Sequence, residues 1–136
     1  MHKLTYFNVE ARAEPIRVAL HAAGVKFEDV RLQFDEFGKA KSEGKYSTGL
    51  PELELPDGTV VTQSCAIARY VAKLGSLYPE DPIQALKCDE VIDLCQDALG
   101  KSPNDPDKDI KKEKREQYAQ GKLKAFFETL ESRVTR

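Results

Sequence analysis

The sequence has little cysteine and histidine and no tryptophan. The three cysteines, Cys65, Cys88 and Cys95, are odd in number and lack C-x-x-C spacing. This usage is typical of a reducing compartment, so we expect a cytoplasmic protein. The cysteines lie in apolar stripes, which favours core thiols over nucleophiles. The two histidines, His2 and His21, have no cysteine partners at ligand spacing, so we expect no metal site.

Charge of one sign and long apolar runs are also missing. Charged residues make up 32% of the 136 residues, but the net charge is only −2. Such a balance offers no basic surface to nucleic acid. No apolar run approaches the roughly 18 residues of a membrane span, so we expect no membrane partner. The first residues lead directly into a strand-like pattern, which is not typical of a signal peptide.

The first third of the chain predicts two parallel strands joined by a helix. Residues 3–7 and 27–32 alternate in the manner of strands. Between them Pro15 suits a first helical turn, an apolar stripe follows at helical spacing, and Gly24 ends the helix. A strand–helix–strand crossover of this kind implies that the two strands are parallel.

The next segment predicts a hairpin and a second helix. Residues 33–49 read as an irregular loop with one short helix, and Asp57-Gly58 is a strong hairpin signal between two short strands. Ser64 suits a helix cap, and the helix behind it ends at Gly75. A mixed four-stranded sheet with packed helices closes this pattern. Residues 1–78 therefore predict an α/β (α+β) domain of thioredoxin-like architecture.

After residues 78–82 the pattern is helical only. One apolar stripe runs from Cys88 to Leu99, and a break follows over residues 100–106. A second helix is expected from about Asp109 to Arg133. Its apolar face comprises Leu123, Phe126, Phe127, Leu130 and Val134. Residues 82–136 thus predict a partial all-α domain of two helices.

Tyr6 and Arg12 raise a question that strand and turn formation do not answer, because neither element requires these side chains. They stand in Lys3-Leu4-Thr5-Tyr6-Phe7-Asn8 and Arg12-Ala13-Glu14; two further segments are Leu50-Pro51 and Gln63-Ser64-Cys65-Ala66-Ile67-Ala68-Arg69-Tyr70. Together these segments resemble the cytosolic glutathione transferases. The likeness is closest to the sigma class, which includes the glutathione-dependent prostaglandin D synthases. It is dense over residues 3–78 and looser beyond.

The resemblance implies catalytic roles for Tyr6 and Arg12. Tyr6 matches the tyrosine whose hydroxyl donates a hydrogen bond to the glutathione sulfur, and Arg12 matches an arginine that helps to hold the thiolate. The alternatives are an ordinary strand aromatic for Tyr6 and a surface ion pair with Glu10 or Glu14 for Arg12. Glu10 and Ala11 depart from the Arg-Gly that is common in relatives.

Four further residues are implied to hold the tripeptide along its length. Leu50 and Pro51 resemble the family's cis-proline step, at which the backbone of Leu50 pairs with the cysteinyl unit. The alternative is a trans proline that merely enters a strand. Gln63 and Ser64 resemble the pair that binds the γ-glutamyl carboxylate, and the start of a helix attracts an anion.

Three other positions carry weaker expectations from the same resemblance. Phe37 stands where sigma-class relatives often have tryptophan, and it cannot supply the indole hydrogen bond. Lys41 lies where a lysine approaches the glycyl carboxylate, although loop lysines are usually only solvated. Asp97 matches an aspartate that crosses the dimer interface to the partner's glutathione; the alternative is a solvated helix carboxylate.

The main functional hypothesis is an enzyme, a glutathione transferase that conjugates glutathione, as cosubstrate, to small hydrophobic electrophiles, and that forms a homodimer. The alternative is a glutathione-binding or structural protein without turnover. A glutaredoxin-type oxidoreductase is disfavoured because residues 8–12 contain no cysteine. The family's helical domain usually has several more helices, so we expect reduced activity from two helices alone.

Overall fold

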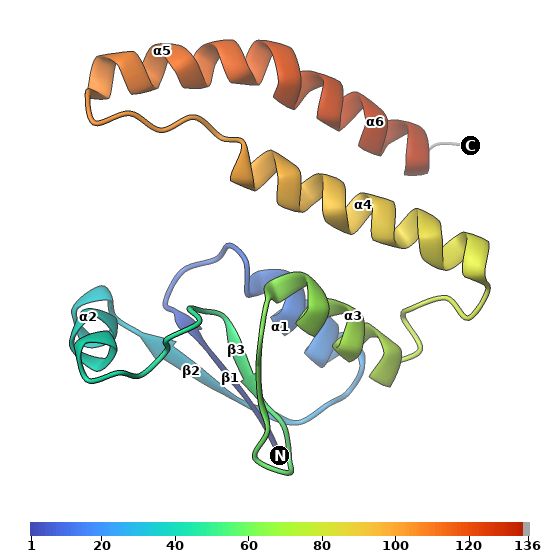
Figure 1. The fold of residues 1–136 in the computed structure, drawn as a ribbon. Helices are drawn as coiled ribbons and strands as arrows, with labels where there is room; N and C mark the ends of the chain where they lie inside the picture. The colour runs from blue at the N-terminus through green and yellow to red at the C-terminus, as the bar shows by residue number, and fades with distance from the viewer. Residues whose placement is uncertain (135–136) are drawn as a thin grey trace. The chain divides into compact units, whose positions relative to one another are not determined.

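The chain forms two compact units in the computed structural model, which describes residues 1–134 (Figure 1). The first unit is Met1–Pro79, and the second begins at Glu80. The division falls inside the proline-containing stretch 78–82, where the predicted domains 1–78 and 82–136 meet.

The first unit is built on a mixed four-stranded sheet, as the sequence predicts. Its strands are β1 (His2–Phe7), β2 (Phe27–Leu32), β3 (Glu52–Glu54) and β4 (Val60–Thr62). The order across the sheet is β2-β1-β3-β4. The β1–β2 pair is parallel, as the crossover implies, whereas β3 pairs antiparallel with both β1 and β4.

Two helices, α1 (Glu14–Ala22) and α3 (Ser64–Leu74), pack against each other over one face of this sheet (Figure 1). The core lies between them and the strands. Its buried hydrophobic residues are Leu4, Tyr6, Ala13, Ile16, Leu20, Leu53, Ile67 and Val71. Each large aliphatic side chain buried there contributes about 1.5–3 kcal/mol. The helix ends approach so closely that a Cβ at Gly75 would lie 2.4 Å from the Cβ of Ala23.

Local sequence signals explain most of the element ends. Pro15 lies in the first turn of α1, and Gly24 follows the helix with φ +65°. The Asp57-Gly58 turn connects β3 to β4, with Gly58 at φ +87°. The predicted loop after β2 contains α2 (Phe34–Ser42), whose start is capped by the Glu36 carboxylate, which accepts from the Gln33 N–H at 2.8 Å.

The start of α3 differs from the sequence prediction by one residue. Ser64 is the first helical residue rather than the cap, and Gln63 occupies the N-cap with φ +77°. A positive φ is rare for a residue with a Cβ and is retained only where the surroundings enforce it. The apolar stripe behind it is buried at Ile67 and Val71, whereas Leu74 is exposed.

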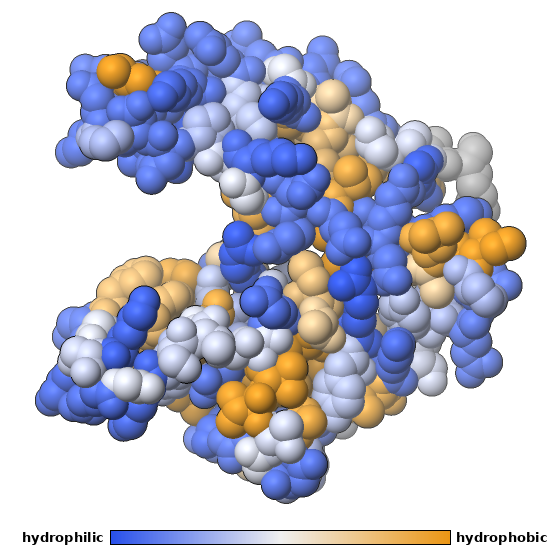
Figure 2. All heavy atoms as spheres, viewed as in Figure 1, coloured by the Kyte–Doolittle hydropathy of each residue, from blue (hydrophilic) through white to orange (hydrophobic). Residues whose placement is uncertain are grey.

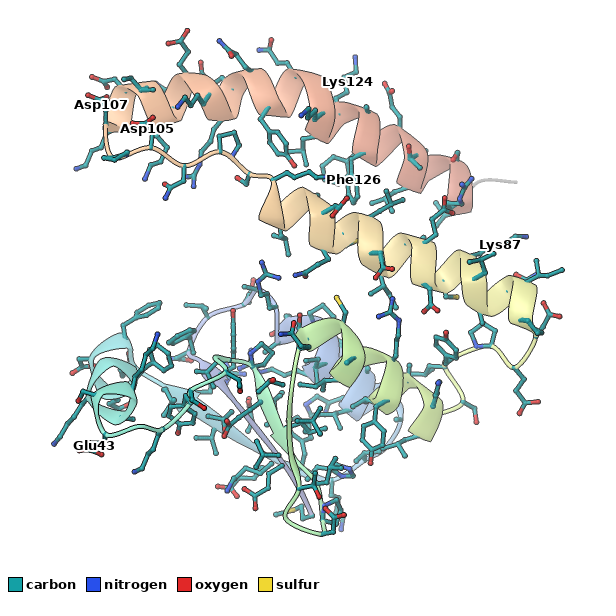
Figure 3. The ribbon with its side chains drawn as sticks, in the orientation of Figure 1. Glu43, Lys87, Asp105, Asp107, Lys124 and Phe126 are labelled. Carbon is teal, nitrogen blue, oxygen red and sulfur yellow. The ribbon has the colours of Figure 1, made fainter. Side chains whose placement is uncertain are left out.

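The second unit consists of helices only. They are α4 (Pro82–Gly100), α5 (Lys108–Tyr118), the π-helical turn η1 (Ala119–Leu123) and α6 (Lys124–Val134). Asp81 caps α4, and Asp107 caps α5 at the end of the connecting loop (Figure 3). The predicted second helix, 109–133, is right in extent but is interrupted by η1. The predicted break over residues 100–106 is also confirmed, because α4 ends at Gly100 and α5 begins at Lys108.

Helix α6 packs along α4 within this unit. Arg133 donates to both carboxylate oxygens of Glu90, at 2.6 and 2.8 Å, and the Tyr118 hydroxyl donates to the Ala98 carbonyl at 2.8 Å. Phe126 points from α6 toward α4 (Figure 3). No residue of α4, α5 or α6 is fully buried. The prediction of core thiols is therefore wrong for Cys95, which is exposed, because two helices cover each other on one side only.

Hydrophilic atoms cover most of α5, and an apolar group lies over the start of α4 (Figure 2). The charged run 111–116 is therefore part of a solvated helix surface. Of the helices within residues 1–134, none combines the length and the apolar character that crossing a membrane requires.

A buried histidine couples the first strand to α3. His2 is 9% exposed, and its Nε2 and the Tyr70 hydroxyl are hydrogen-bonded at 3.0 Å. Burial, and secondarily the charge of the chain's amino terminus, lower the pKa of His2 from its ordinary value of 6.5. The neutral imidazole is therefore the form that the folded unit prefers.

We predict that this histidine makes the first unit less stable in weak acid. A lowered pKa contributes stability above the unfolded pKa of about 6.5, and that contribution is lost as the pH falls through the folded pKa. Denaturant unfolding of the parent chain and of His2→Gln between pH 8 and 5 checks this. The parent should lose more stability on acidification, by less than about 1.4 kcal/mol per pH unit, the limit for one proton. Parallel pH profiles for the two proteins would contradict the prediction.

Candidate functional site

The strand registers bring residues from three elements to one end of the sheet. Thr5 of β1 lies opposite Glu52 of β3, and Glu52 lies opposite Thr62 of β4. The next position along each strand is therefore Tyr6, Pro51 or Gln63. With about 4.8 Å between neighbouring strands, this row is about 10 Å wide. It contains three of the predicted site residues.

Tyr6 is the buried member of this row. It is 6% exposed, and its ring contacts that of Phe7 edge-on at 5.3 Å between centroids. Among residues 1–134 its hydroxyl makes no hydrogen bond, and no buried side-chain oxygen lacks a partner. The oxygen must therefore be reached by solvent. A tyrosine that packs its ring in the core and leaves its hydroxyl open is placed to donate to a ligand.

Arg12 lies in the loop between β1 and α1, one residue before the buried Ala13, and is half-buried. The neighbouring Glu14 carboxylate pairs with Arg17 at 3.1 Å. Ala11 has φ +142°, a conformation that favours glycine. An alanine held at this angle is strained, because its Cβ crowds the backbone.

Leu50 and Pro51 are joined by a cis peptide bond, as predicted. Pro51 is buried, and Leu50 packs against the core. Both residues precede β3 directly, so they lie beside the end of β1 that carries Tyr6.

Gln63 and Ser64 end the row on its other side. Ser64 opens α3, and no acidic residue lies in the first turn of that helix. The first N–H groups of a helix have no intrahelical acceptors and carry partial positive charge. The position can therefore bind an anion, in the manner predicted for a carboxylate.

Phe37 and Lys41 belong to an aromatic cluster on α2. Phe7 contacts Phe34 at 4.8 Å and Phe37 at 5.0 Å between centroids, and Tyr46 stacks on Phe37 at 5.9 Å. The Lys41 ammonium lies 5.8 Å from the centroid of Phe37, so the structure does bring these two predicted residues together. Phe7 connects the cluster to Tyr6.

Asp97 lies on α4 in the second unit. Its carboxylate accepts from the Lys101 ammonium at 2.7 Å, one helical turn away, and both side chains are exposed. An exposed pair at this spacing contributes little to stability. Its carboxylate therefore remains exchangeable between Lys101 and another donor.

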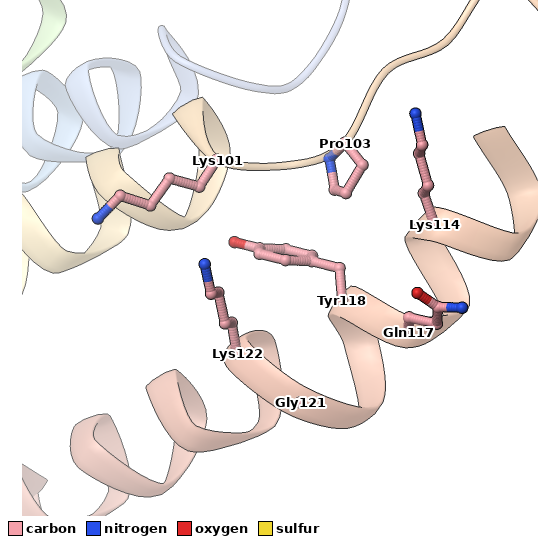
Figure 4. A pocket seen from close by; sticks show the side chains of 7 residues that line it. All are labelled: Lys101, Pro103, Lys114, Gln117, Tyr118, Gly121 and Lys122. Atoms are coloured by element: carbon pink, nitrogen blue, oxygen red, sulfur yellow. The ribbon is translucent and has the colours of Figure 1, made fainter. Parts of the chain in front are cut away.

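A separate cavity of about 380 Å³ lies in the second unit, where α5 meets the preceding loop (Figure 4). It is lined by Lys101, Pro103, Lys114, Gln117, Tyr118, Gly121 and Lys122. Lys101 pairs with Asp97 and Lys114 with Asp105, both at 2.7 Å, and Tyr118 donates to a backbone carbonyl. No predicted glutathione residue lines this cavity, and the candidate site stays at the end of the sheet. Residues 1–134 contain no cluster of histidine, cysteine and carboxylate side chains that could hold a metal ion.

Arg17, which no sequence pattern singles out, is buried beside the candidate site. It is 3% exposed and lies among Asp29, Glu14 and two backbone carbonyls. The Glu14–Arg17 spacing of three residues is a signal for a helical ion pair, but the strand partner Asp29 becomes visible only once α1 is packed on the sheet.

Comparison with known proteins agrees with this geometry. Residues 2–73 match the family described as glutathione S-transferase, N-terminal domain. Over 98 residues the chain is 38% identical to hematopoietic prostaglandin D synthase of Gallus gallus, covering 72% of this chain and 48% of that protein. Over the same length it is 37% identical to glutathione S-transferase 1 of Ascaris suum, covering 72% of this chain and 47% of the relative.

Solved structures give the same assignment. Prostaglandin synthase D of Nilaparvata lugens superposes with a TM-score of 0.87 at 33% identity, covering 98% of this chain and 68% of that one. The structure of rat hPGDS complexed with a quinoline superposes with a TM-score of 0.85 at 28% identity, covering 96% of this chain and 66% of that one. The chain spans about half the length of the curated relatives it matches. Because residues 2–73, more than half of the chain, match this N-terminal domain, the chain belongs to the glutathione S-transferase family.

Proposed function

We propose that this protein is a glutathione transferase, which binds glutathione across the end of its sheet and activates the thiol for attack on small hydrophobic electrophiles. The observation that carries the proposal is the Tyr6 hydroxyl, which is solvent-reached and without a partner among residues 1–134 although its ring is buried. Tyr6, which carries this hydroxyl, lies in the row of residues that includes Pro51 and Gln63.

The chemistry required of Tyr6 is the stabilisation of a thiolate. A free thiol with a pKa of about 8.5 is mostly protonated at neutral pH, whereas the anion is the nucleophile. A hydroxyl that donates to the sulfur favours the anion and lowers that pKa. Arg12 would add positive charge from the adjoining loop. Glutathione serves as a cosubstrate in this scheme, and no resident cofactor is required.

The dimensions of the row suit an extended tripeptide. Three fully extended residues span at most about 10 Å, close to the width of the row from Tyr6 to Gln63. We propose that the γ-glutamyl carboxylate binds at Gln63 and Ser64, the cysteinyl unit beside Leu50 and Pro51, and the glycyl carboxylate toward Lys41. Phe37 would then contribute its ring face rather than a hydrogen bond.

The test is glutathione-affinity capture followed by a conjugation assay. The chain should be retained on immobilised glutathione, released by the free tripeptide, and should conjugate it to a small aryl halide. A chain that is retained but produces no conjugate would be the non-catalytic alternative. A chain that is not retained would overturn the proposal as a whole.

The family resemblance also supports proposals on class, location and assembly. We propose a sigma-class protein with a cytoplasmic, detoxifying role and a homodimeric state in which Asp97 of each copy approaches the partner's glutathione. The second unit favours association because it exposes large apolar side chains, namely Ile83, Leu86, Leu99, Ile110, Phe127 and Val134. Figure 2 shows the apolar group at the start of α4. Large contiguous apolar surfaces of soluble proteins mark sites of association.

Light scattering is therefore expected to report a dimer or a larger species at micromolar concentration. Each exposed apolar side chain that becomes buried contributes about 1.5–3 kcal/mol, and several together can drive association. Leu86→Glu should shift the population toward monomer, whereas Val18→Glu, an equally drastic change at an exposed site of α1, should not. A monomer that binds little hydrophobic dye and has full conjugation activity would contradict the prediction.

A further inference from the structure

Arg17 occupies a place that a charged residue rarely takes. It lies on α1 and is only 3% exposed. Isolating a guanidinium from water is costly unless it is paired and hydrogen-bonded, so a buried arginine indicates a specific set of partners.

Those partners come from three different segments. The Arg17 Nε donates to Asp29 of β2 at 3.1 Å, and Nη1 donates to Glu14 at 3.1 Å. Nη1 also donates to the carbonyl of Val9 at 3.2 Å, and Nη2 donates to the carbonyl of Phe7 at 3.5 Å. Phe7 is the last residue of β1, and Val9 lies in the loop that carries Arg12. The Arg17 side chain therefore ties the start of that loop to both α1 and β2.

The network continues onto the same loop from the strand side. The second carboxylate oxygen of Asp29 accepts from Arg31 at 2.8 Å, and Arg31 donates weakly to the Asn8 side chain at 3.4 Å. Asp29 therefore orients both arginines. The two arginines thus donate hydrogen bonds to three consecutive residues, Phe7 to Val9, which directly follow Tyr6.

The loop needs such a restraint because it contains a strained residue. Ala11 has φ +142°, and a non-glycine residue in such a region persists only when its surroundings enforce it. The Ala11 carbonyl accepts from the Glu14 N–H at 3.1 Å, while the Glu14 carboxylate is held by Arg17. Arg17 thus restrains the loop on both sides of Ala11.

We propose that Arg17, oriented by Asp29, is a positioning residue that fixes Tyr6 and Arg12 relative to the glutathione sulfur. This inference rests on the proposed function. Arg17 need not contact glutathione for this role. The physical content of the inference is that the loop 8–13 is held in one strained conformation by a buried guanidinium, and that the ligand site depends on that conformation.

Three variants of the full chain test the inference. Arg17→Met with Asp29→Asn removes the guanidinium without leaving a buried carboxylate charge, so the fold should survive. Arg17→Lys keeps the positive charge but loses the planar guanidinium, so its changes in loop exchange and thiol pKa should be smaller than those of the double variant. Ala11→Gly, added to the double variant, should not restore the positioning, because glycine relieves the strain but widens the range of loop conformations.

Two readouts separate positioning from general destabilisation. Hydrogen exchange of the amides of residues 9–13, measured without glutathione, should accelerate about tenfold in the double variant while the amides of β1 and α3 keep their protection. With glutathione bound, the thiol pKa should rise by about one unit and conjugation should slow about tenfold, with less change in KM. A general loss of stability would instead accelerate exchange across the whole unit.

The outcomes are distinguishable from those that test the function itself. If the parent chain neither binds glutathione nor lowers its thiol pKa, the proposed function fails and this inference with it. If the parent chain does both, unchanged loop exchange and an unchanged thiol pKa in the double variant would overturn the role of Arg17 alone. Faster loop exchange with an unchanged thiol pKa would also overturn the role of Arg17. It would show that the loop conformation does not affect the glutathione sulfur.

Discussion

Tyr6→Phe should leave glutathione affinity nearly unchanged and slow conjugation by roughly 10–1000-fold. The phenylalanine ring fills the same volume in a position that is 6% exposed, so the core should stay intact. What is lost is one donor aimed at the sulfur. The thiolate then loses its stabilisation relative to the thiol, and the pKa of the bound thiol rises toward its value in free glutathione.

Thiolate absorbance titrated against pH in both proteins measures this effect directly. Tyr70→Phe is the matched control, because it removes a hydroxyl from the same unit but at the opposite end of β1, where Tyr70 pairs with His2. The control should reduce stability and leave the thiol pKa alone. An unchanged thiol pKa in Tyr6→Phe would remove Tyr6 from the catalytic role.

Much of the first unit could be predicted from the sequence because its signals are local. Alternation over residues 27–32 and the Asp57-Gly58 turn define β2 and the hairpin, and their pairing follows from chain connectivity. Once the registers are known, the convergence of Tyr6, Pro51 and Gln63 is a matter of geometry. The roles assigned to these residues come from the family resemblance, and their common place at one end of the sheet comes from the strand pairing.

The rest depended on tertiary contacts that no short pattern contains. In the sequence, Arg17 looks like an ordinary charged residue beside an apolar stripe. In the folded unit it is buried, and Asp29 of β2 provides a carboxylate partner for it. Ser64 has the chemistry of a cap, yet the positive φ of Gln63 moves the cap one residue earlier. Cys95 follows the period of an apolar stripe, but α4 has too little cover within its unit to bury that stripe.

Glutathione affinity should depend most on Gln63 and Ser64. A buried or partly buried charged acceptor that loses a donor costs about 1–3 kcal/mol, so each change to alanine should weaken binding by about 5- to 150-fold. Gln63→Ala keeps a Cβ at the same positive φ, and the backbone strain is therefore unchanged. Ser64→Ala places a strong helix former at the first position of α3 and removes only the hydroxyl.

Calorimetric titration with glutathione measures both changes, and Gln84→Ala, in the first turn of α4, controls for the loss of a side-chain amide at a helix start. The double variant should bind much more weakly than either single one while unfolding at the parent's denaturant concentration. The residual bound thiol should keep the parent's pKa, because these residues hold the γ-glutamyl end and Tyr6 acts at the sulfur. Binding and activation are then separable along one tripeptide. Parent affinity in the double variant would place the γ-glutamyl group elsewhere, and a raised thiol pKa would show that the two ends of the row do not act independently.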